Sequence, residues 1–190
     1  TAATRLGAAG GTLYASGEES LQQVSLRGQR LGADLSTVHA IATTRVEDVL
    51  AAVHEIRPAC VIVDSIQTMA TDLLPSTPGS PNQLRTCAGY LVRLAKESGI
   101  AVILVGHVTK DGQIAGPRLL EHMVDVVLYF ESETASRFRI LRSVKNRFGA
   151  ANEIGIFVMS EGGIREVRNP SALFVSQRGE PVPGSVVTAV

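Results

Sequence analysis

The chain has 190 residues, with 18 basic and 18 acidic side chains, so its net charge gives no general attraction to nucleic acid or membranes. Hydrophobic residues make up 45% of the sequence and charged residues 19%, which excludes a disordered chain and indicates strands buried on both faces. The longest apolar run, Ile100 to Gly106, is far shorter than the roughly 18 residues that a membrane span needs. We therefore expect a cytoplasmic protein without a membrane partner, in which any anion site is local.

The predicted elements alternate between strands and helices, which is typical of a mostly parallel sheet covered by helices. A helix is predicted over residues 1–9 and a buried strand over 12–16. Two capping boxes, each a Ser or Thr followed three residues later by Glu, predict where the next helices begin: Ser16 with Glu19, and Thr44 with Glu47.

The middle of the chain contains the most apolar predicted strands. These strands cover residues 59–64, 100–106 and 124–131, and the longest amphipathic helix follows a Pro-rich loop at 75–81. Cys60 and Cys87 lie in apolar patterns without C-x-x-C spacing, so we expect both to be reduced and structural.

The C-terminal part changes character. Shorter strands are predicted at residues 138–144, 153–160 and 164–167, joined by Gly-rich turns that favour antiparallel pairing at the sheet edge. We therefore predict a single domain over residues 1–190. Its fold class is α/β, with a mostly parallel twisted sheet flanked by helices and antiparallel strands at the C-terminal edge.

Polar residues at the ends of predicted strands are candidates for chemistry. Asp64 ends a buried strand, where a carboxylate suits Mg²⁺, although many parallel strands end in Asp only to cap a loop. At the strand-to-helix corner the capping box accounts for Glu19, which leaves Glu18 to polarise a water for attack on a phosphoryl group. His107 follows another apolar strand and either donates to a phosphate or satisfies backbone groups.

A local positive patch lies in residues 137–147, and it contains Arg137, Arg139, Arg142, Lys145 and Arg147. Strand alternation predicts all of them except Arg142 on one side of the strand, which a solvated face explains in most proteins. Beside the turn at Gly149, Lys145 and Arg147 can also reach a phosphate presented by another chain. The sequence contains neither a G-x-x-x-x-G-K-[ST] phosphate-binding loop nor a G-x-S-x-G hydrolase elbow.

Four segments, in order, strongly resemble the RadA (Sms) family of bacterial DNA repair proteins: residues 13–24, 61–69, 105–131 and the KNRFG turn at 145–149. The resemblance implies a RecA-like ATPase core that uses ATP and Mg²⁺ and forms a homo-hexamer on single-stranded DNA. It also implies branch migration of recombination intermediates together with RecA recombinase. Family members carry a four-cysteine zinc element, a phosphate-binding loop and a Lon-protease-like domain outside this region, so we expect this chain to be a fragment that is inactive alone.

The resemblance implies roles for residues around the nucleotide. Asp64 matches the aspartate that positions Mg²⁺ on the nucleotide, and Ser65 follows it directly. Glu18 resembles the glutamate that activates the attacking water. His107 falls where RecA-like proteins carry a polar residue that senses the γ-phosphate.

The resemblance also implies contacts to DNA and to a neighbouring subunit. Lys145 and Arg147 match the family turn that reaches the neighbour's nucleotide, while Lys110 and Arg118 lie in a stretch that resembles a DNA-facing loop. The loop over residues 71–83 is a second candidate facing the central channel. Two alternatives stay open: another RecA-like motor of the DnaB or KaiC type, and a non-catalytic DNA-binding or ring-assembly fragment.

Overall fold

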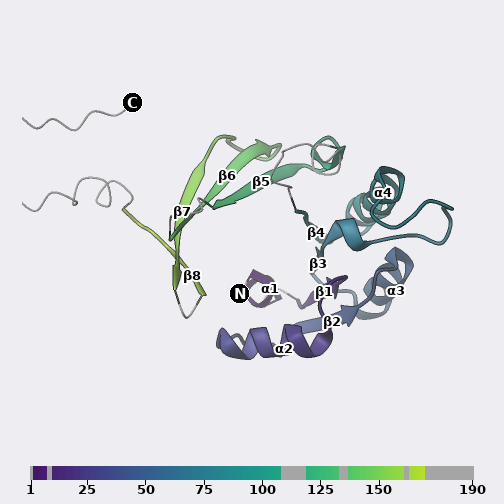
Figure 1. Ribbon diagram of the computed structural model, residues 1–190, viewed down its shortest axis with the longest axis horizontal. Coiled ribbons are helices and arrows are strands. Elements are labelled where there is room, and N and C mark those ends of the chain that lie inside the picture. Colours follow the sequence, from purple (N-terminus) through teal and green to yellow (C-terminus); the bar gives the residue numbers. More distant parts are fainter. Residues whose placement is uncertain (1, 8–9, 108–118, 133–136, 161–162, 170–190) are drawn as a thin grey trace, which may run out of the picture. The chain divides into compact units, whose positions relative to one another are not determined.

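The structure, a computed structural model, describes residues 2–7, 10–107, 119–132, 137–160 and 163–169 (Figure 1). It contains two compact units, Thr1–Asp125 and Val126–Val190, and the single domain predicted from the sequence stays a prediction. In the first unit the elements are α1 (Ala2–Gly7), β1 (Thr12–Ser16), α2 (Leu21–Arg30), β2 (Val38–Ala42), α3 (Val46–Ile56), β3 (Cys60–Asp64), the 3-10 helix η1 (Ile66–Thr68), α4 (Pro81–Ser98) and β4 (Ala101–Val105). None of the helices that the structure describes is long and apolar enough to cross a membrane.

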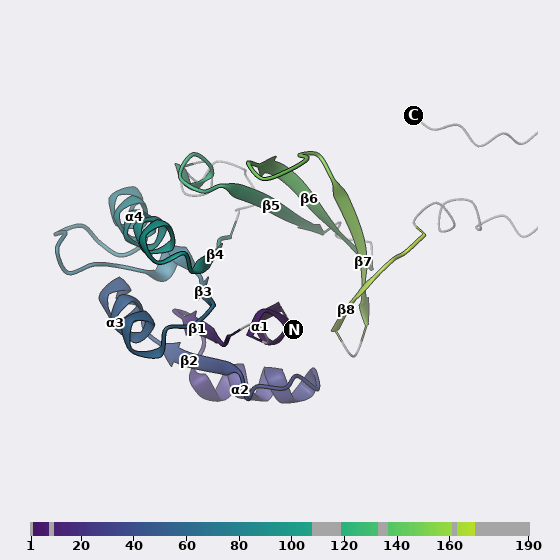
Figure 2. The same ribbon diagram turned by 180° about the vertical axis from the view of Figure 1, so that it is seen from behind.

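The first unit is built on a four-stranded parallel sheet with the strand order β2-β1-β3-β4. Figures 1 and 2 both place α3 and α4 on the same side of this sheet. Side chains alternate along a strand, and the side chains of β1 and β3 that belong to the hydrophobic core with α3 and α4 are Leu13, Ala15, Val61 and Val63. The α/β class with a parallel sheet flanked by helices is therefore confirmed.

The other face of the sheet carries the alternate residues of β1 and β3. Here Thr12, at the start of β1, donates a hydrogen bond of 2.9 Å from its hydroxyl to the Ala3 carbonyl of α1. Farther along the same face, Tyr14 is in register with Ile62, and Ser16 with Asp64. This face therefore begins under α1 and ends at polar side chains.

The start of α2 differs from the sequence prediction. The helix begins at Leu21, and its capping box consists of Ser20 and Gln23 rather than Ser16 and Glu19. The Ser16 hydroxyl instead accepts a hydrogen bond of 2.9 Å from the Glu19 backbone N–H, which closes a turn between β1 and the helix. Two possible capping boxes overlap in this stretch, Ser16 with Glu19 and Ser20 with Gln23. Because Ser16 is the last residue of β1, the box of Ser20 and Gln23 caps the helix.

The predicted capping box at the start of α3 is also wrong. Arg45 is the N-cap residue of α3 and makes no side-chain capping bond. The Glu47 carboxylate instead accepts a hydrogen bond from the Thr71 hydroxyl, far away in the sequence. Because the Glu47 carboxylate bonds to Thr71, the Thr44–Glu47 spacing in the sequence did not determine its role.

The strand β2 was not predicted from the sequence. It lies at the edge of the parallel sheet, where β1 is its one partner among the strands that the structure describes. Its residues are half-buried or exposed, and His39 interrupts its apolar run. An edge strand of this kind lacks the continuous apolar pattern that makes the central strands recognisable.

The loop between η1 and α4 is held by Gln83, a buried residue of the α4 first turns. Its amide oxygen accepts a hydrogen bond of 2.9 Å from Thr71 N, and its amide nitrogen donates to the carbonyls of Thr71, Leu74 and Ser76. One buried side chain thus satisfies several backbone groups of the loop. The proposed channel-facing role of residues 71–83 stays a prediction.

Both cysteines are free and buried, as the sequence predicts. Burial raises the pKa of the Cys60 thiol, and burial together with the negative charge of Glu47 raises the pKa of Cys87 to about 11. Thiols with raised pKa values are poor nucleophiles at neutral pH, which agrees with a structural role.

The second unit is a four-stranded antiparallel sheet in the order β5-β6-β7-β8. Its strands are β5 (Val126–Ser132), β6 (Phe138–Asn146), β7 (Ile154–Ser160) and β8 (Gly163–Glu166). The predicted antiparallel pairing is confirmed, and these strands pair with one another as a sheet of their own.

A bulge in β6 corrects the predicted alternation of its basic residues. Leu128 pairs with Ser143 and the adjacent Val127 pairs with Lys145, so Val144 is the extra residue. Paired residues share a face, and one extra residue moves every following side chain to the opposite face. Lys145 therefore lies on the face opposite to Arg139, and the prediction that both share one side is wrong.

Candidate functional site

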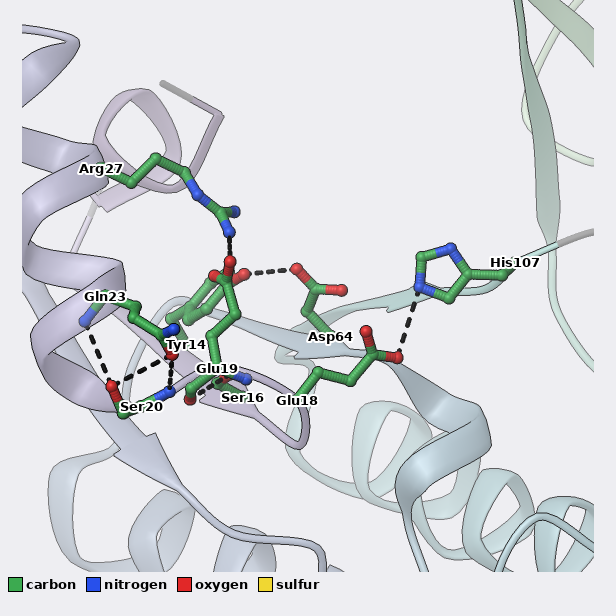
Figure 3. A network of polar contacts seen from close by, with 9 residues as sticks. All are labelled: Tyr14, Ser16, Glu18, Glu19, Ser20, Gln23, Arg27, Asp64 and His107. Atoms are coloured by element: carbon green, nitrogen blue, oxygen red, sulfur yellow. Dashed lines mark hydrogen bonds and ion pairs between the residues drawn. The ribbon is translucent and has the colours of Figure 1, made fainter.

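The candidate site of the first unit lies where the parallel strands end. Because parallel strands present their carboxyl ends at the same edge, residues that follow β1, β3 and β4 meet there. Ser16, Asp64 and Val105 are in register across these strands, and Glu18 and His107 follow directly (Figure 3). A cavity of about 190 Å³ is lined by Ser16, Glu18, Glu19, Arg27, Asp64 and His107. Four predicted site residues thus come together: Glu18, Asp64, Ser65 and His107.

Glu18 is held by groups from the two other strand ends. The hydroxyl of Ser65, a fully buried residue, donates a hydrogen bond of 2.8 Å to Glu18 Oε1. Nε2 of His107 lies 3.5 Å from the same oxygen. Since Glu18 is exposed at the cavity while its carboxylate is oriented by these contacts, it is placed to accept a proton from a molecule bound there.

His107 is fixed through its backbone as well. The Gln67 side chain, on η1, donates a hydrogen bond of 3.0 Å from its amide nitrogen to the His107 carbonyl. Nothing in the local sequence pattern of Gln67 marks it as part of this site, so the sequence did not predict its contact. The contact joins the segment after β3 to the segment after β4, so both carboxyl ends are tied together next to the cavity.

Asp64 is contacted by Tyr14, a residue that the sequence pattern did not predict at the site. The Tyr14 hydroxyl donates a hydrogen bond to Asp64 Oδ2. Burial, and then the hydrogen bond and negative charge of Asp64, raise the pKa of Tyr14 far above its ordinary value, so the phenol stays protonated. A tyrosine in a buried strand needs a hydrogen-bond partner for its hydroxyl, and this requirement was the feature of the sequence that could have pointed to Tyr14.

Glu19 and Arg27 form an ion pair beside this contact (Figure 3). Arg27 lies on α2 and is exposed, and its guanidinium opposes the rise in the pKa of Tyr14. The capping role predicted for Glu19 is therefore replaced by a contact to a cation that also lines the cavity.

Asp64 is a carboxylate at this cavity that could hold a hard cation. Among the residues that the structure describes, no group of three or more His, Cys, Asp or Glu side chains is arranged to hold a metal ion. Mg²⁺ in nucleotide enzymes is typically bound by one or two carboxylates, with phosphate oxygens and waters completing its shell. The donor set thus fits Mg²⁺ that arrives with a nucleotide and does not fit a cage made by protein side chains alone.

Gly17 fits the corner between β1 and α2 closely against η1. Its backbone N–H donates a hydrogen bond of 2.8 Å to the Asp64 carbonyl. A Cβ atom at this position would lie 1.8 Å from Thr68 Oγ1 and 2.8 Å from Thr68 Cβ. Only a residue without a side chain can therefore occupy this corner.

We expect Gly17→Ala to destabilise the chain by about 3 kcal/mol, because such an overlap forces the backbone to shift. The measurement is urea unfolding followed by circular dichroism. Gly89→Ala is the matched control. Gly89 lies inside α4, and a Cβ atom at this position would lie 3.9 Å from Met123 Cε, so this substitution should leave the stability unchanged or raise it. Adding Thr68→Gly should restore part of the lost stability, and a Gly17→Ala chain as stable as the original would contradict the packing described.

In the second unit the predicted cations lie at the turn between β6 and β7. The Asn146 side chain organises this turn, since Phe148 N donates a hydrogen bond of 3.0 Å to its amide oxygen and its amide nitrogen donates one of 3.1 Å to the Ala150 carbonyl. Arg147 is exposed, Phe148 is 81% exposed and Lys145 is half-buried. The sequence pattern predicted the basic residues of this turn but did not indicate that the Asn146 side chain holds it together.

The remaining predicted site residues, Lys110 and Arg118, lie outside the described residues. Their proposed contacts to DNA stay predictions. The structure thus brings together Glu18, Asp64, Ser65 and His107 in the first unit and places Lys145 and Arg147 in the second unit.

No family model matches the chain. Among curated proteins, the DNA repair protein RadA of Brucella abortus is 56% identical over 182 residues, which cover 93% of this chain and 39% of that protein. DNA repair protein RadA of Bacillus subtilis is 51% identical over 96% of the chain, and that of Escherichia coli 49% identical over 94%. The chain spans about two fifths of the length of these relatives.

Proposed function

We propose that this chain, a homologue of the RadA proteins over more than nine-tenths of its length, is the RecA-like ATPase core of a DNA repair motor. The motor hydrolyses ATP and acts on single-stranded DNA and on branched recombination intermediates. The observation that carries the proposal is the meeting of Glu18, Ser65, Asp64 and His107 around one cavity at the carboxyl edge of a parallel sheet. Ligands of open α/β sheets bind at this edge.

Each residue at the cavity has a distinct proposed task. Asp64 holds Mg²⁺, which when bound neutralises charge on the phosphates. Glu18, oriented by Ser65, accepts a proton from the attacking water. His107 contacts Glu18 on one side and borders the cavity on the other, which suits a residue that senses whether the γ-phosphate is present.

The cations of the second unit complete the proposed site from a neighbouring subunit. In a homo-hexamer, Lys145 and Arg147 stabilise the charge that develops on the transferred phosphoryl group. The exposure of Arg147 in a turn held by Asn146 supports presentation to another chain. Lys110 and Arg118 are proposed to contact DNA phosphates.

The relatives' name, DNA repair protein RadA, supports the biological setting. We infer that the motor works in the cytoplasm with RecA recombinase, drives branch migration, and belongs to a longer protein. In that protein a zinc element and a phosphate-binding loop precede this segment and a Lon-protease-like domain follows it.

ATP hydrolysis with and without single-stranded DNA tests the proposal. It is measured for this chain and for the extended protein, meaning the chain lengthened upstream to include a phosphate-binding loop, because the 190 residues contain no G-x-x-x-x-G-K-[ST] motif. We expect ATP hydrolysis only in the extended protein, and we expect single-stranded DNA to increase its rate. An extended protein that binds DNA and assembles yet never hydrolyses ATP would favour a non-catalytic scaffold.

A further inference from the structure

The function proposed above assigns no role to the contact between Tyr14 and Asp64. Tyr14 lies in β1, Asp64 ends the neighbouring strand β3, and both side chains lie on the same face of the sheet. Tyr14 is in register with Ile62, so its ring reaches diagonally along the sheet to the carboxylate that is two residues farther on. A phenylalanine at this position would place its ring in the same space but could not donate a hydrogen bond to Asp64.

The hydrogen bond distinguishes the two oxygens of the Asp64 carboxylate. Tyr14 donates to Oδ2, which leaves Oδ1 as the oxygen that this contact does not engage. Asp64 lines the cavity with Glu18 and His107, so the orientation of its carboxylate decides which oxygen a ligand in the cavity meets. Figure 3 shows Tyr14 approaching Asp64 from the side of Arg27, while His107 and Glu18 lie on the other side of the carboxylate.

Tyr14 is suited to this role by its position. Its ring is half-buried in β1 and its hydroxyl donates to Asp64 Oδ2, so the packing of the ring and the hydrogen bond together hold the carboxylate in one orientation. Groups that orient a metal ligand in this way commonly change metal affinity about 10- to 100-fold when they are removed.

We infer that Tyr14 is a positioning residue, whose hydroxyl fixes the Asp64 carboxylate so that Oδ1 faces the Mg²⁺–nucleotide complex. The inference rests on the proposed function, since it assigns a second residue to the same magnesium site. It adds a contact that determines metal affinity and leaves the residues that touch the nucleotide unchanged.

The first test is Tyr14→Phe in the extended protein, with binding of a non-hydrolysable ATP analogue measured at increasing Mg²⁺ concentrations. We expect the Mg²⁺ concentration at half-saturation to rise about 10- to 100-fold, with binding in the absence of Mg²⁺ unchanged. Tyr90→Phe is the matched control, because Tyr90 is equally half-buried, packs against the core from α4 and should show no shift. An unchanged Mg²⁺ dependence in Tyr14→Phe would overturn the inference.

A second variant separates this inference from the proposed function. Asp64→Asn should abolish the Mg²⁺ dependence of nucleotide binding. If it does while Tyr14→Phe behaves like the original, the function stands and the role of Tyr14 falls. If Asp64→Asn leaves Mg²⁺-dependent binding intact, the magnesium site itself, and with it the proposed function, is wrong.

A spectroscopic test needs no substitution at Tyr14 and so does not depend on whether the variant folds. The sequence contains three tyrosines, and ¹³C labelling of the phenol carbon gives each one a resolvable resonance. Adding Mg²⁺ with the ATP analogue to the extended protein should shift the Tyr14 signal, because its partner carboxylate then faces a cation, while the Tyr90 signal stays in place. A Tyr14 signal that does not respond to Mg²⁺ would overturn the inference.

Discussion

Replacement of Lys145 by alanine is expected to lower the kcat for ATP hydrolysis of the extended protein by about 10³-fold or more, with the fold intact. A cation supplied to the transferring phosphoryl group from a neighbouring subunit contributes about 10³- to 10⁵-fold in related reactions. Lys145 lies near the end of β6, beyond the bulge at Val144, and it pairs with Val127 through its backbone, which alanine retains. The thermal melt followed by circular dichroism should therefore be unchanged.

Arg139→Ala is the matched control for Lys145→Ala. Both residues are half-buried basic side chains of β6, and the bulge places them on opposite faces of the sheet. We expect Arg139→Ala to keep turnover within a few-fold of the original, because a cation on the other face does not share the proposed position. Full ATPase activity in Lys145→Ala, with an unchanged melt, would remove Lys145 from the mechanism.

Replacement of Glu18 by glutamine is expected to lower kcat by about 10²- to 10⁴-fold while nucleotide binding persists. Glutamine keeps an oxygen to which the Ser65 hydroxyl can donate, so the local contact survives and only the basic carboxylate is lost. The measurement is a single-turnover hydrolysis rate at saturating ATP and Mg²⁺, beside the affinity for a non-hydrolysable analogue.

Glu19→Gln tests whether the effect belongs to Glu18 itself. Both carboxylates line the cavity, but Glu19 is paired with Arg27, whereas Glu18 faces Ser65 and His107. We expect Glu19→Gln to change kcat no more than a few-fold. Equal losses in the two variants would show that the negative charge of the corner matters and that neither carboxylate acts as the base.

Mixing the two inactive variants tests the neighbouring-subunit arrangement directly. In a ring where Glu18 and Lys145 of one site come from different subunits, an interface between a Lys145→Ala subunit and a Glu18→Gln subunit can contain both intact residues. Random mixing should then restore activity at about a quarter of the interfaces of a symmetric ring. No recovery, with mixed rings demonstrated, would place both residues in the same subunit's site.

Much of the candidate site could be predicted from the sequence because parallel strands impose a simple rule. Their carboxyl ends meet at one edge, so Asp64, Glu18 and His107, each at or just after a strand end, had to lie near one another. The apolar runs of the central strands identified the sheet in the same way. The edge strand β2 was missed because its residues are half-buried or exposed and His39 interrupts its apolar run.

What only the tertiary structure decided depends on contacts between residues far apart in the chain. The sequence pattern at Ser16 and Ser20 allowed two helix starts, and the length of β1 selected the second. The partner of Tyr14 is fifty residues away, on the neighbouring strand, and no local pattern specifies it.

The sequence by itself determined the parallel α/β fold, the homology to RadA and the strand-end residues, because hydrophobic periodicity and the order of motifs can be read along the chain without knowing its contacts. The tertiary structure decided how these residues are held and on which face Lys145 lies. A single extra residue at Val144 reverses that face, and its position depends on pairing between two strands, which alternation along one strand cannot reveal.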